Sequence, residues 1–330
     1  MVRVTRKTVV CALLSAAMIS LAPGFASAQD YPTKTVRIIV PVPPGGPTDF
    51  IARVVAERLN AMWGQPVIVE SKAGATGAIA NDAVSNAEPD GYTILIGNVS
   101  TNAINFAAIP KKREGVKLTP VTNLIQVPGV LTGSKELEAK SAEDLVAKMK
   151  SGELKGIKFG STGIGTYSQI DMLRFLKQNN LEATHIAYKG AAQALPALLG
   201  NEIQLEFLNL STGLPLVKDG RLKAFATTWP ERVPELPDVP TLKELGYGDV
   251  GTSAWHGMFV TEGTPQPVID KIYASVKSIY EQPDIQKKIA DQNSKATLSK
   301  SPAEFATFVE SEIVKWTKLI KDNDIKVTAD

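Results

Sequence analysis

The sequence has little of three things that many functions require: cysteine, histidine and net charge. It holds one cysteine and two histidines in 330 residues, which excludes a disulfide framework and a cysteine-based zinc site and leaves too few histidines for a histidine cluster. Its 36 basic and 34 acidic side chains give a net charge of +2. Nucleic-acid binding usually needs a concentrated basic face. The sequence therefore predicts no metal, no cofactor and no nucleic-acid partner.

Long apolar runs are also absent, except near the amino terminus. A basic start is followed there by an apolar run from Val9 to Leu21 and by the small residues Ala26-Ser27-Ala28. This pattern is typical of a secretory signal peptide, and the run is shorter than the roughly 20 residues that a spanning helix needs. A lipid anchor on Cys11 is disfavoured because no small residue precedes it. We expect residues 1–28 to be cleaved near Ala28 and the chain to be exported to the periplasm.

Short apolar runs alternate with helical patterns along the rest of the chain. Such alternation predicts βαβ units and mostly parallel sheets flanked by helices, and the length suggests two lobes. No flexible linker is visible, so the lobes should be discontinuous and joined by short strands. Strands are expected at 35–40, 67–69, 92–97, 121–127, 157–160, 184–188, 203–208, 222–228 and 256–261. Helices are expected at 48–63, 78–87, 141–150, 166–179, 191–199, 213–219, 265–281 and 301–322.

Glycine-bearing loops between strands and helices are the candidate binding segments, because ligands bind at the carboxyl ends of parallel strands. The first loop is Pro44-Gly45-Gly46-Pro47-Thr48-Asp49. Its glycines permit close backbone approach, and free amides at the following helix start favour an anion such as a carboxylate. The alternative is a plain strand-to-helix turn.

Three further loops have the same position in the pattern. Residues 160–166 supply the hydroxyls of Ser161, Thr162 and Thr166, although Ser168 replaces the third glycine of a dinucleotide-binding motif. Residues 188–192 end in Ala191 and Ala192, and residues 97–102 include Ser100 and Thr101. Simple loop capping is the alternative for residues 97–102, and for residues 188–192 the alternative is that Lys189 is only a solvated surface charge.

Catalytic patterns are weaker. Ser161 has Phe159 two residues before it rather than the glycine of a serine-hydrolase motif. His185 and His256 lie in apolar strand patterns, which favours packed structural histidines, and Asp49 has no second acid at motif spacing. We therefore predict no catalytic residue, while an exported α/β enzyme using Asp49 or His256 as a base stays open.

The ordered motifs resemble one family across the whole chain after residue 28. They begin with Val40-Pro41-Val42-Pro43 and the first loop, and continue through Pro89-Asp90-Gly91-Tyr92, Tyr188-Lys189-Gly190 and Leu236-Pro237-Asp238-Val239-Pro240-Thr241. This set is similar to that of the Bug-type periplasmic solute-binding receptors of tripartite tricarboxylate transporters. The resemblance implies a two-lobed α/β Venus-flytrap fold with two crossover strands. Lobe one would be 29–129 plus 254–330, and lobe two 130–253.

The resemblance also implies a function: capture of a small organic carboxylate or dicarboxylate between the lobes and delivery to a membrane permease, by a monomer without a cofactor. A ligand-sensing receptor for a membrane signalling protein is an alternative. Leu208 replaces an acid found in many relatives, which argues against an amino acid and keeps aromatic acids among the candidates. The ligand-binding residues carried over are Pro44, Gly45, Gly46, Pro47, Thr48, Asp49, Ser100, Thr101, Ser161, Thr162, Thr166, Ala191, Ala192 and Asn209.

The charge and cysteine counts of the chain after residue 28 agree with this interpretation. Residues 1–28 contain three basic side chains, no acidic one and the only cysteine, so 33 basic and 34 acidic side chains remain after cleavage. A cysteine-free chain suits an oxidising periplasm. With a net charge of −1, the protein would capture an anion through a few oriented amides and hydroxyls rather than through bulk charge.

Overall fold

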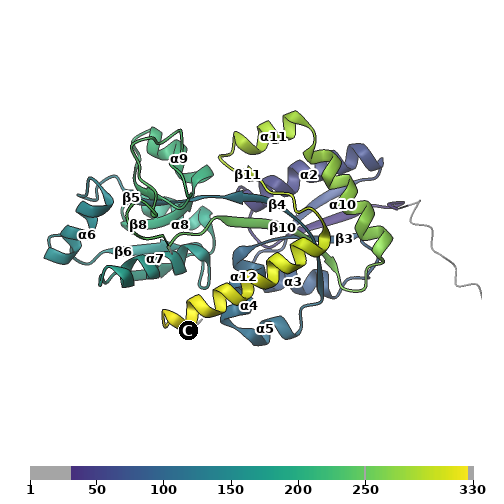
Figure 1. Cartoon of the computed structure of the whole chain (residues 1–330), viewed down its shortest axis with the longest axis horizontal. Coiled ribbons are helices and arrows are strands. Elements are labelled where there is room, and N and C mark those ends of the chain that lie inside the picture. The colour runs from purple at the N-terminus through teal and green to yellow at the C-terminus, as the bar shows by residue number, and fades with distance from the viewer. Residues whose placement is uncertain (1–30, 249, 326–330) are drawn as a thin grey trace, which may run out of the picture. The chain divides into compact units, whose positions relative to one another are not determined.

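The computed structural model describes residues 31–248 and 250–325, so the expected signal peptide lies outside the described residues. The described chain forms two sheets flanked by helices (Figure 1). The α/β fold with two sheets is confirmed.

The first sheet, called sheet A, has six strands in the order β11-β4-β10-β3-β1-β2. β1 is parallel to β2 and β3, whereas β10 is antiparallel to β3 and β4, and β11 is antiparallel to β4. The strands are β1 (Val36–Val40), β2 (Val67–Ser71), β3 (Thr93–Asn98), β4 (Leu118–Val127), β10 (Ala254–Thr261) and β11 (Lys295–Ala296).

The second sheet, called sheet B, has five strands in the order β7-β6-β8-β5-β9. β6 is parallel to β7 and β8, and β5 is antiparallel to β8 and β9. The strands are β5 (Gly129–Ser134), β6 (Lys158–Ser161), β7 (Thr184–Ala187), β8 (Leu205–Asn209) and β9 (Leu222–Thr227).

The chain passes from sheet A to sheet B and back. Only Pro128 separates β4 from β5, and the return leads from β9 to β10. β4 and β10 run side by side in Figure 1 and pair along their length, with Val127 opposite Ala254. Because these two strands carry the chain in opposite directions, they are antiparallel. The sheets are consequently mixed rather than mostly parallel as predicted.

Helices cover both faces of sheet B. One core cluster joins its strands to α6 and α7 through residues such as Leu145 and Phe175, and another joins them to α8 and α9 through Leu198 and Leu214. The α-helices are α2 (Pro47–Trp63), α3 (Ala78–Ser85), α4 (Asn105–Ala108), α5 (Pro110–Glu114), α6 (Ala142–Ser151), α7 (Tyr167–Gln178), α8 (Ala191–Leu199), α9 (Leu210–Lys218), α10 (Gln266–Tyr280), α11 (Pro283–Ala290) and α12 (Pro302–Asp322).

Sheet A is also covered by helices of recognisable amphipathic pattern. In α2 the apolar residues Ile51, Val55 and Leu59 recur at helical spacing and are fully buried. The helix ends at Gly64, whose φ of 64° is the left-handed conformation that favours glycine. α3 and α12 contribute Val84, Phe305 and others to a single cluster with β3 and β10.

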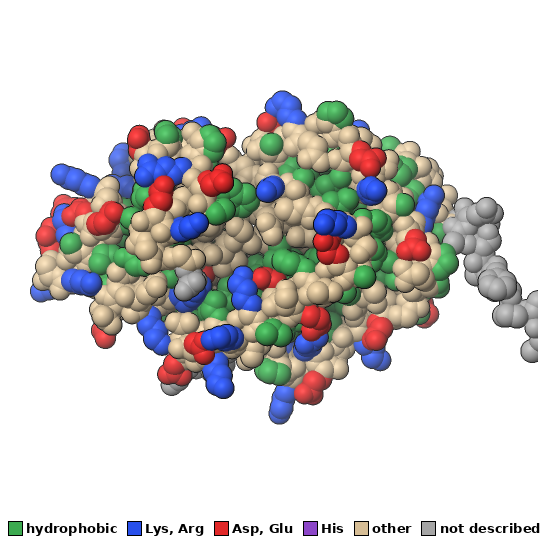
Figure 2. Space-filling view, viewed as in Figure 1, with side chains coloured by type: hydrophobic (Ala, Val, Ile, Leu, Met, Phe, Trp, Pro, Cys, Tyr) green, Lys and Arg blue, Asp and Glu red, His purple; other side chains and the backbone are tan. Residues whose placement is uncertain are grey.

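The face of the molecule shown in Figure 2 has no strong excess of one charge sign. Acidic and basic side chains are interspersed over the face shown in Figure 2, as the near-equal counts suggest. None of the helices in the described ranges combines the length and the hydropathy that crossing a membrane would require.

Candidate ligand-binding site

The predicted binding residues follow the carboxyl ends of β1, β3, β6, β7 and β8. In sheet A, β1 and β3 are parallel to each other, and in sheet B, β7 and β8 are both parallel to β6. Their carboxyl ends therefore lie at one edge of each sheet, where ligands bind in α/β folds. The contacts below connect these edges to one another.

The first loop is held together by Asp49. The Asp49 carboxylate accepts the amide hydrogen of Gly45 at 3.1 Å and pairs with Arg53, whose Nε lies 3.0 Å away. The Asp49 side chain is buried, whereas that of Arg53 is mostly exposed. Both partners occupy the carboxylate, so the geometry gives Asp49 a loop-organising role and leaves it poorly placed as a base.

Thr48 is fixed from two sides. Its Oγ1 lies 2.9 Å from Nδ1 of His256 on β10 and accepts a 3.4 Å hydrogen bond from Nδ2 of Asn98. His256 is 4% exposed, and burial lowers its pKa to about 3, so the ring is neutral at neutral pH. Its Nε2 has no hydrogen-bond partner among the described residues. His256 is a packed, hydrogen-bonded histidine, as the apolar strand pattern predicted.

The Ser100 loop joins this network. The Oδ1 atom of Asn98 accepts the amide hydrogens of Ser100 at 2.9 Å and Thr101 at 3.2 Å. The hydroxyl of Ser100 in turn accepts the amide hydrogen of Tyr167, the first residue of α7, at 3.2 Å. A loop of sheet A is thus bonded to a helix that follows a strand of sheet B.

The second loop is closed on its own backbone. Ser161 Oγ donates to the carbonyl of Gly163 at 3.0 Å, and Thr166 Oγ1 donates to the same carbonyl at 2.7 Å. Ser161 also lies 2.7 Å from Nε2 of His185 and is fully buried. Thr162 is half-buried. The hydroxyls of Ser161 and Thr166 are therefore engaged within the loop.

The third loop meets the first. Gly190 has a φ of 95°, and a methyl group built on it would lie 3.4 Å from Cγ of Pro43. Ala191 and Ala192 follow as the first, exposed residues of α8. The loops after β1 and β7 are thus in close approach.

Asn209 is oriented by the side chain of Tyr167. The Oδ1 atom of Asn209 accepts the hydroxyl hydrogen of Tyr167 at 2.7 Å. Burial raises the pKa of Tyr167, so the phenol keeps its hydrogen. With its oxygen engaged, Asn209 has its amide NH2 left to donate.

Four helices at these loops begin without a side-chain cap. α2, α7, α8 and α9 have Gly46, Thr166, Gly190 and Asn209 at the N-cap position, and none of these side chains bonds to the helix amides. Among the described α-helices only α6 and α12 have a side-chain cap, from Ser141 and Ser301. The helices α3, α4, α5, α10 and α11 are uncapped as well, so the position of a helix start beside a cavity, rather than the missing cap, distinguishes it. Uncapped amino-terminal amides attract anions, and the helix dipole adds to that attraction.

Two of these helix starts border a small cavity of about 60 Å³. The first loop and α2 supply Gly45, Gly46, Pro47 and Phe50, whereas α9 supplies Ser211 and Thr212, and Gln292 and Ser294 complete the lining. Ser211 and Thr212 follow Asn209 at a strand end, so the strand-end rule could have found them. Gln292 and Ser294 carry no comparable sequence signal.

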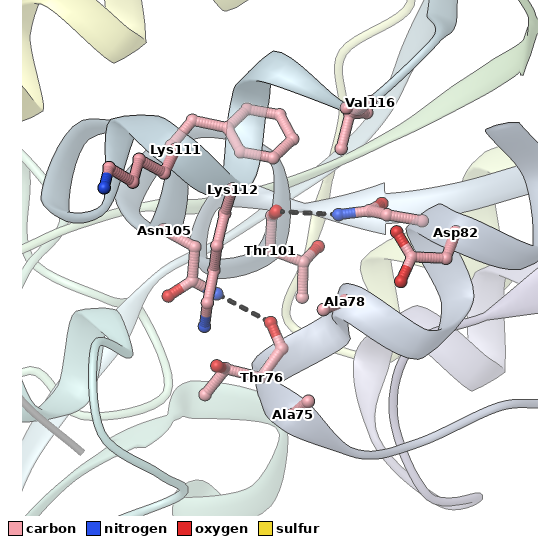
Figure 3. A pocket seen from close by; sticks show the side chains of 12 residues that line it. Ala75, Thr76, Ala78, Asp82, Thr101, Asn105, Lys111, Lys112 and Val116 are labelled. Atoms are coloured by element: carbon pink, nitrogen blue, oxygen red, sulfur yellow. Dashed lines mark hydrogen bonds between the residues drawn. The ribbon is translucent and has the colours of Figure 1, made fainter. Parts of the chain in front are cut away.

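A larger cavity of about 260 Å³ lies elsewhere and is lined partly by η2 (Ala75–Gly77) and η3 (Ser100–Ile104) (Figure 3). Lys111, Lys112 and Asn105 line it, and among the predicted residues only Thr101 takes part. Asn105 donates to the carbonyl of Thr76 at 2.6 Å. No group of three or more histidine, cysteine, aspartate or glutamate side chains is placed for a metal ion within the described residues.

Two mixed sheets joined by crossing strands, with strand-end loops of both sheets around one polar cavity, define a two-lobed α/β binding protein. A sequence model described as "Tripartite tricarboxylate transporter family receptor" matches residues 51–325. Protein BugT of Bordetella pertussis is 30% identical over 306 residues, which are 91% of this chain and 93% of that protein. The chain therefore belongs to the tripartite tricarboxylate transporter receptor family, and is a periplasmic solute-binding protein of that family.

Solved structures agree with this assignment. MatC of Rhodopseudomonas palustris with bound malate is 28% identical and superposes with a TM-score of 0.80 over 88% of this chain and 100% of that one. A protein of R. palustris with adipate, also 28% identical, superposes with a TM-score of 0.83 over 89% of this chain and 98% of that one. Both of those proteins hold an aliphatic dicarboxylate.

Proposed function

We propose that this protein binds a small organic carboxylate or dicarboxylate in the cavity between the first loop and α9. The observation that carries the proposal is that the amino termini of α2 and α9, one beside each sheet, border the same cavity and lack side-chain caps. A dicarboxylate can place one carboxylate at each helix start. The malate and adipate bound to the two similar proteins support this ligand class.

The roles of individual residues follow from their contacts. Because the Thr48 hydroxyl bonds to His256 and Asn98, the backbone amides of the first loop, rather than this hydroxyl, would meet one carboxylate. Ser211, Thr212 and the amide of Asn209 would meet the other end of the ligand. Ser161, Thr166, Ser100 and Asp49 would act by holding their loops in shape.

We further propose that lobe one comprises residues 29–129 plus 254–330 and lobe two residues 130–253, so that the ligand lies between the lobes. Ligand binding would favour the closed arrangement, since the ligand contacts both lobes only there. The closed receptor would deliver its ligand to a membrane permease after export and cleavage near Ala28. A membrane signalling protein is the alternative partner.

Catalysis is the rival proposal, and the geometry supports it less. Asp49 is already paired with Arg53, and the neutral ring of His256 is almost fully buried. A general base must come within hydrogen-bond distance of the proton that it removes. Incubation with a ligand followed by mass spectrometry separates the two proposals: a binding protein returns the ligand unchanged.

A thermal-shift screen of the exported chain tests the ligand class. Malate, succinate, adipate and benzoate are compared with aspartate and glutamate at equal concentration. We expect one or more carboxylates without an amino group to raise the melting temperature, because a ligand that binds only the native state stabilises it against unfolding. A shift with aspartate or glutamate alone would overturn the proposed class.

A further inference from the structure

Behind the second loop, three side chains form a hydrogen-bonded chain across three elements. Ser161 at the end of β6 lies 2.7 Å from Nε2 of His185 on β7, and Nδ1 of the same ring lies 3.3 Å from Nε2 of Gln169 on α7. The His185 ring stacks on Phe159 with 4.8 Å between ring centroids. Gln169 is 5% exposed and Ser161 is fully buried.

The direction of each hydrogen bond follows from one backbone amide. The N–H of Gly165 donates to Oε1 of Gln169 at 2.7 Å. An N–H requires an acceptor, so this atom is the oxygen, and the NH2 group of Gln169 faces Nδ1 of His185. An amide NH2 group only donates, so Nδ1 must be the unprotonated nitrogen. A neutral imidazole then carries its hydrogen on Nε2.

The tautomer of His185 determines whether Ser161 donates or accepts the hydrogen bond between them. The Nε2–H of His185 donates to Ser161 Oγ, and the serine's own hydrogen is left for the carbonyl of Gly163 at 3.0 Å. The chain of donors thus starts at Gly165 and ends at Gly163, two residues apart in the same loop. Burial lowers the pKa of His185, in keeping with a neutral ring.

We propose that Gln169 fixes the Nε2–H tautomer of His185, and that this directional chain holds residues 161–165 in the shape that the ligand requires. Gln169 and His185 are then positioning residues. This inference rests on the proposed function, in which Ser161 and Thr166 act by holding the second loop in shape. It also explains why a buried serine beside a histidine is no nucleophile here.

The hydrogen bonds of this chain run in the opposite direction to those of a serine-hydrolase triad. In such a triad an acid accepts the Nδ1 hydrogen, and Nε2 takes the proton of the serine. Here an amide donates to Nδ1, so Nε2 has no lone pair for Ser161. The variant Gln169→Glu should reverse the chain, since its carboxylate can accept both the Gly165 amide hydrogen and a hydrogen on Nδ1. Ser161 would then donate to His185, and Gly163 would lose that donor.

Nitrogen-15 NMR of histidine-labelled protein reads the tautomer directly. The chain has two histidines, so the spectrum contains two rings, and His185→Phe identifies the relevant one by its loss. We expect the Nε2–H form in the wild-type protein and the Nδ1–H form in Gln169→Glu. Gln178→Glu makes the same chemical change at an exposed position of the same helix, and should leave the ring unchanged. An Nδ1–H ring in the wild-type protein would overturn the inference.

Ligand affinity tests the positioning role. Calorimetry uses whichever of malate, succinate, adipate and benzoate stabilises the wild-type protein most in the thermal-shift screen. We expect Gln169→Glu to weaken binding about tenfold, on the order of one hydrogen bond, and Gln178→Glu to change it by less than about twofold. Gln169→Leu, which adds no charge, should also weaken binding and give a mixture of tautomers. Unchanged affinity in both Gln169 variants would refute the positioning role.

Failure of the proposed function would look different. If none of malate, succinate, adipate and benzoate binds the wild-type protein, the ligand class is wrong, but the tautomer measured by NMR still decides whether Gln169 controls His185. If the acids bind and the ring carries Nδ1–H, the proposed function survives and this inference does not.

Discussion

The hydroxyl of Thr48 lies 2.9 Å from Nδ1 of His256, a residue 208 positions further along the chain. Thr48 belongs to the first loop, and His256 belongs to a strand that brings the chain back from sheet B. The ring is buried and neutral. The first loop is therefore anchored on the core of sheet A rather than being free at the surface.

Replacing Thr48 by valine should destabilise the protein. The change leaves Nδ1 of His256 and the amide of Asn98 without this partner in a buried site, which costs about 1–3 kcal/mol. Urea unfolding measures the loss. Thr48→Ser keeps the hydroxyl and should stay within about 1 kcal/mol of the wild-type protein. Equal losses in both variants would mean that the methyl group matters and the hydrogen bond does not.

Asp49 and Arg53 should differ sharply in their effect on ligand binding. Asp49→Ala removes the acceptor that holds the Gly45 amide, so the loop loosens and affinity should fall about tenfold. Arg53→Ala removes only a mostly exposed partner, and exposed ion pairs contribute about 0–1 kcal/mol. Calorimetry with the acid found in the screen measures both. A larger loss in Arg53→Ala would instead indicate that the guanidinium contacts the ligand.

The buried carboxyl group of Glu206 should make the folded protein lose stability as pH rises. It is fully buried on β8, and neither carboxylate oxygen has a hydrogen-bond partner among the described residues. Burial raises its pKa to about 8, against about 4.3 in an unfolded chain. Between these values the folded chain holds a proton that the unfolded chain has released. The contribution of Glu206 to the free energy of unfolding is therefore fully present below about pH 4.3. It declines as pH rises to about 8, by up to about 1.4 kcal/mol per pH unit.

Unfolding by urea at pH 6 and pH 9 measures this loss. Glu206→Gln, which keeps the shape without the titration, should lose less stability across the interval than the wild-type protein. Glu202→Gln at a nearby exposed position serves as the matched control and should behave like the wild-type protein. Parallel pH profiles of the wild-type protein and Glu206→Gln would show that the Glu206 carboxyl titrates normally.

The two cavities make opposite predictions about the binding site. The double variant Ser211→Ala/Thr212→Ala removes hydroxyls from the small cavity and should weaken carboxylate binding about threefold to tenfold. Lys111→Ala/Lys112→Ala removes both cations from the larger cavity and should leave affinity within about twofold. A strong loss of affinity in the lysine variant alone would instead indicate that the ligand binds in the larger cavity.

The periodic elements could be predicted from the sequence with good accuracy, because their patterns are local. The helix expected at 48–63 is observed at Pro47–Trp63, and the one expected at 301–322 at Pro302–Asp322. β5 was not predicted: its six buried residues include Gly129 and Gly133, and glycine is depleted in strands. Its place is set by pairing with β8 and β9, which no local pattern reveals.

The candidate site could be predicted as a set of loops but not as a set of contacts. Strand-end position selected the loops after β1, β3, β6 and β7, and the family resemblance added Asn209 at the end of β8. The engagement of Ser161 by His185 and of Asn209 by Tyr167 depends on the packing of neighbouring strands and helices, so it has no signature at fixed spacing. For the same reason Gln169 looked like an ordinary helical residue.

The pairing of Val127 with Ala254 has a consequence for protein engineering. Opposed residues of an antiparallel pair lie about 4.5–5.5 Å apart, a gap that a two-residue hairpin turn spans. Val127 faces Ala254 where the chain leaves and re-enters sheet A. β4 and β10 therefore pair like the two strands of a hairpin, with residues 128–253 in the place of its turn. We expect that this segment can be exchanged between relatives at two adjacent junctions, which would transfer sheet B with its loops from one receptor to another.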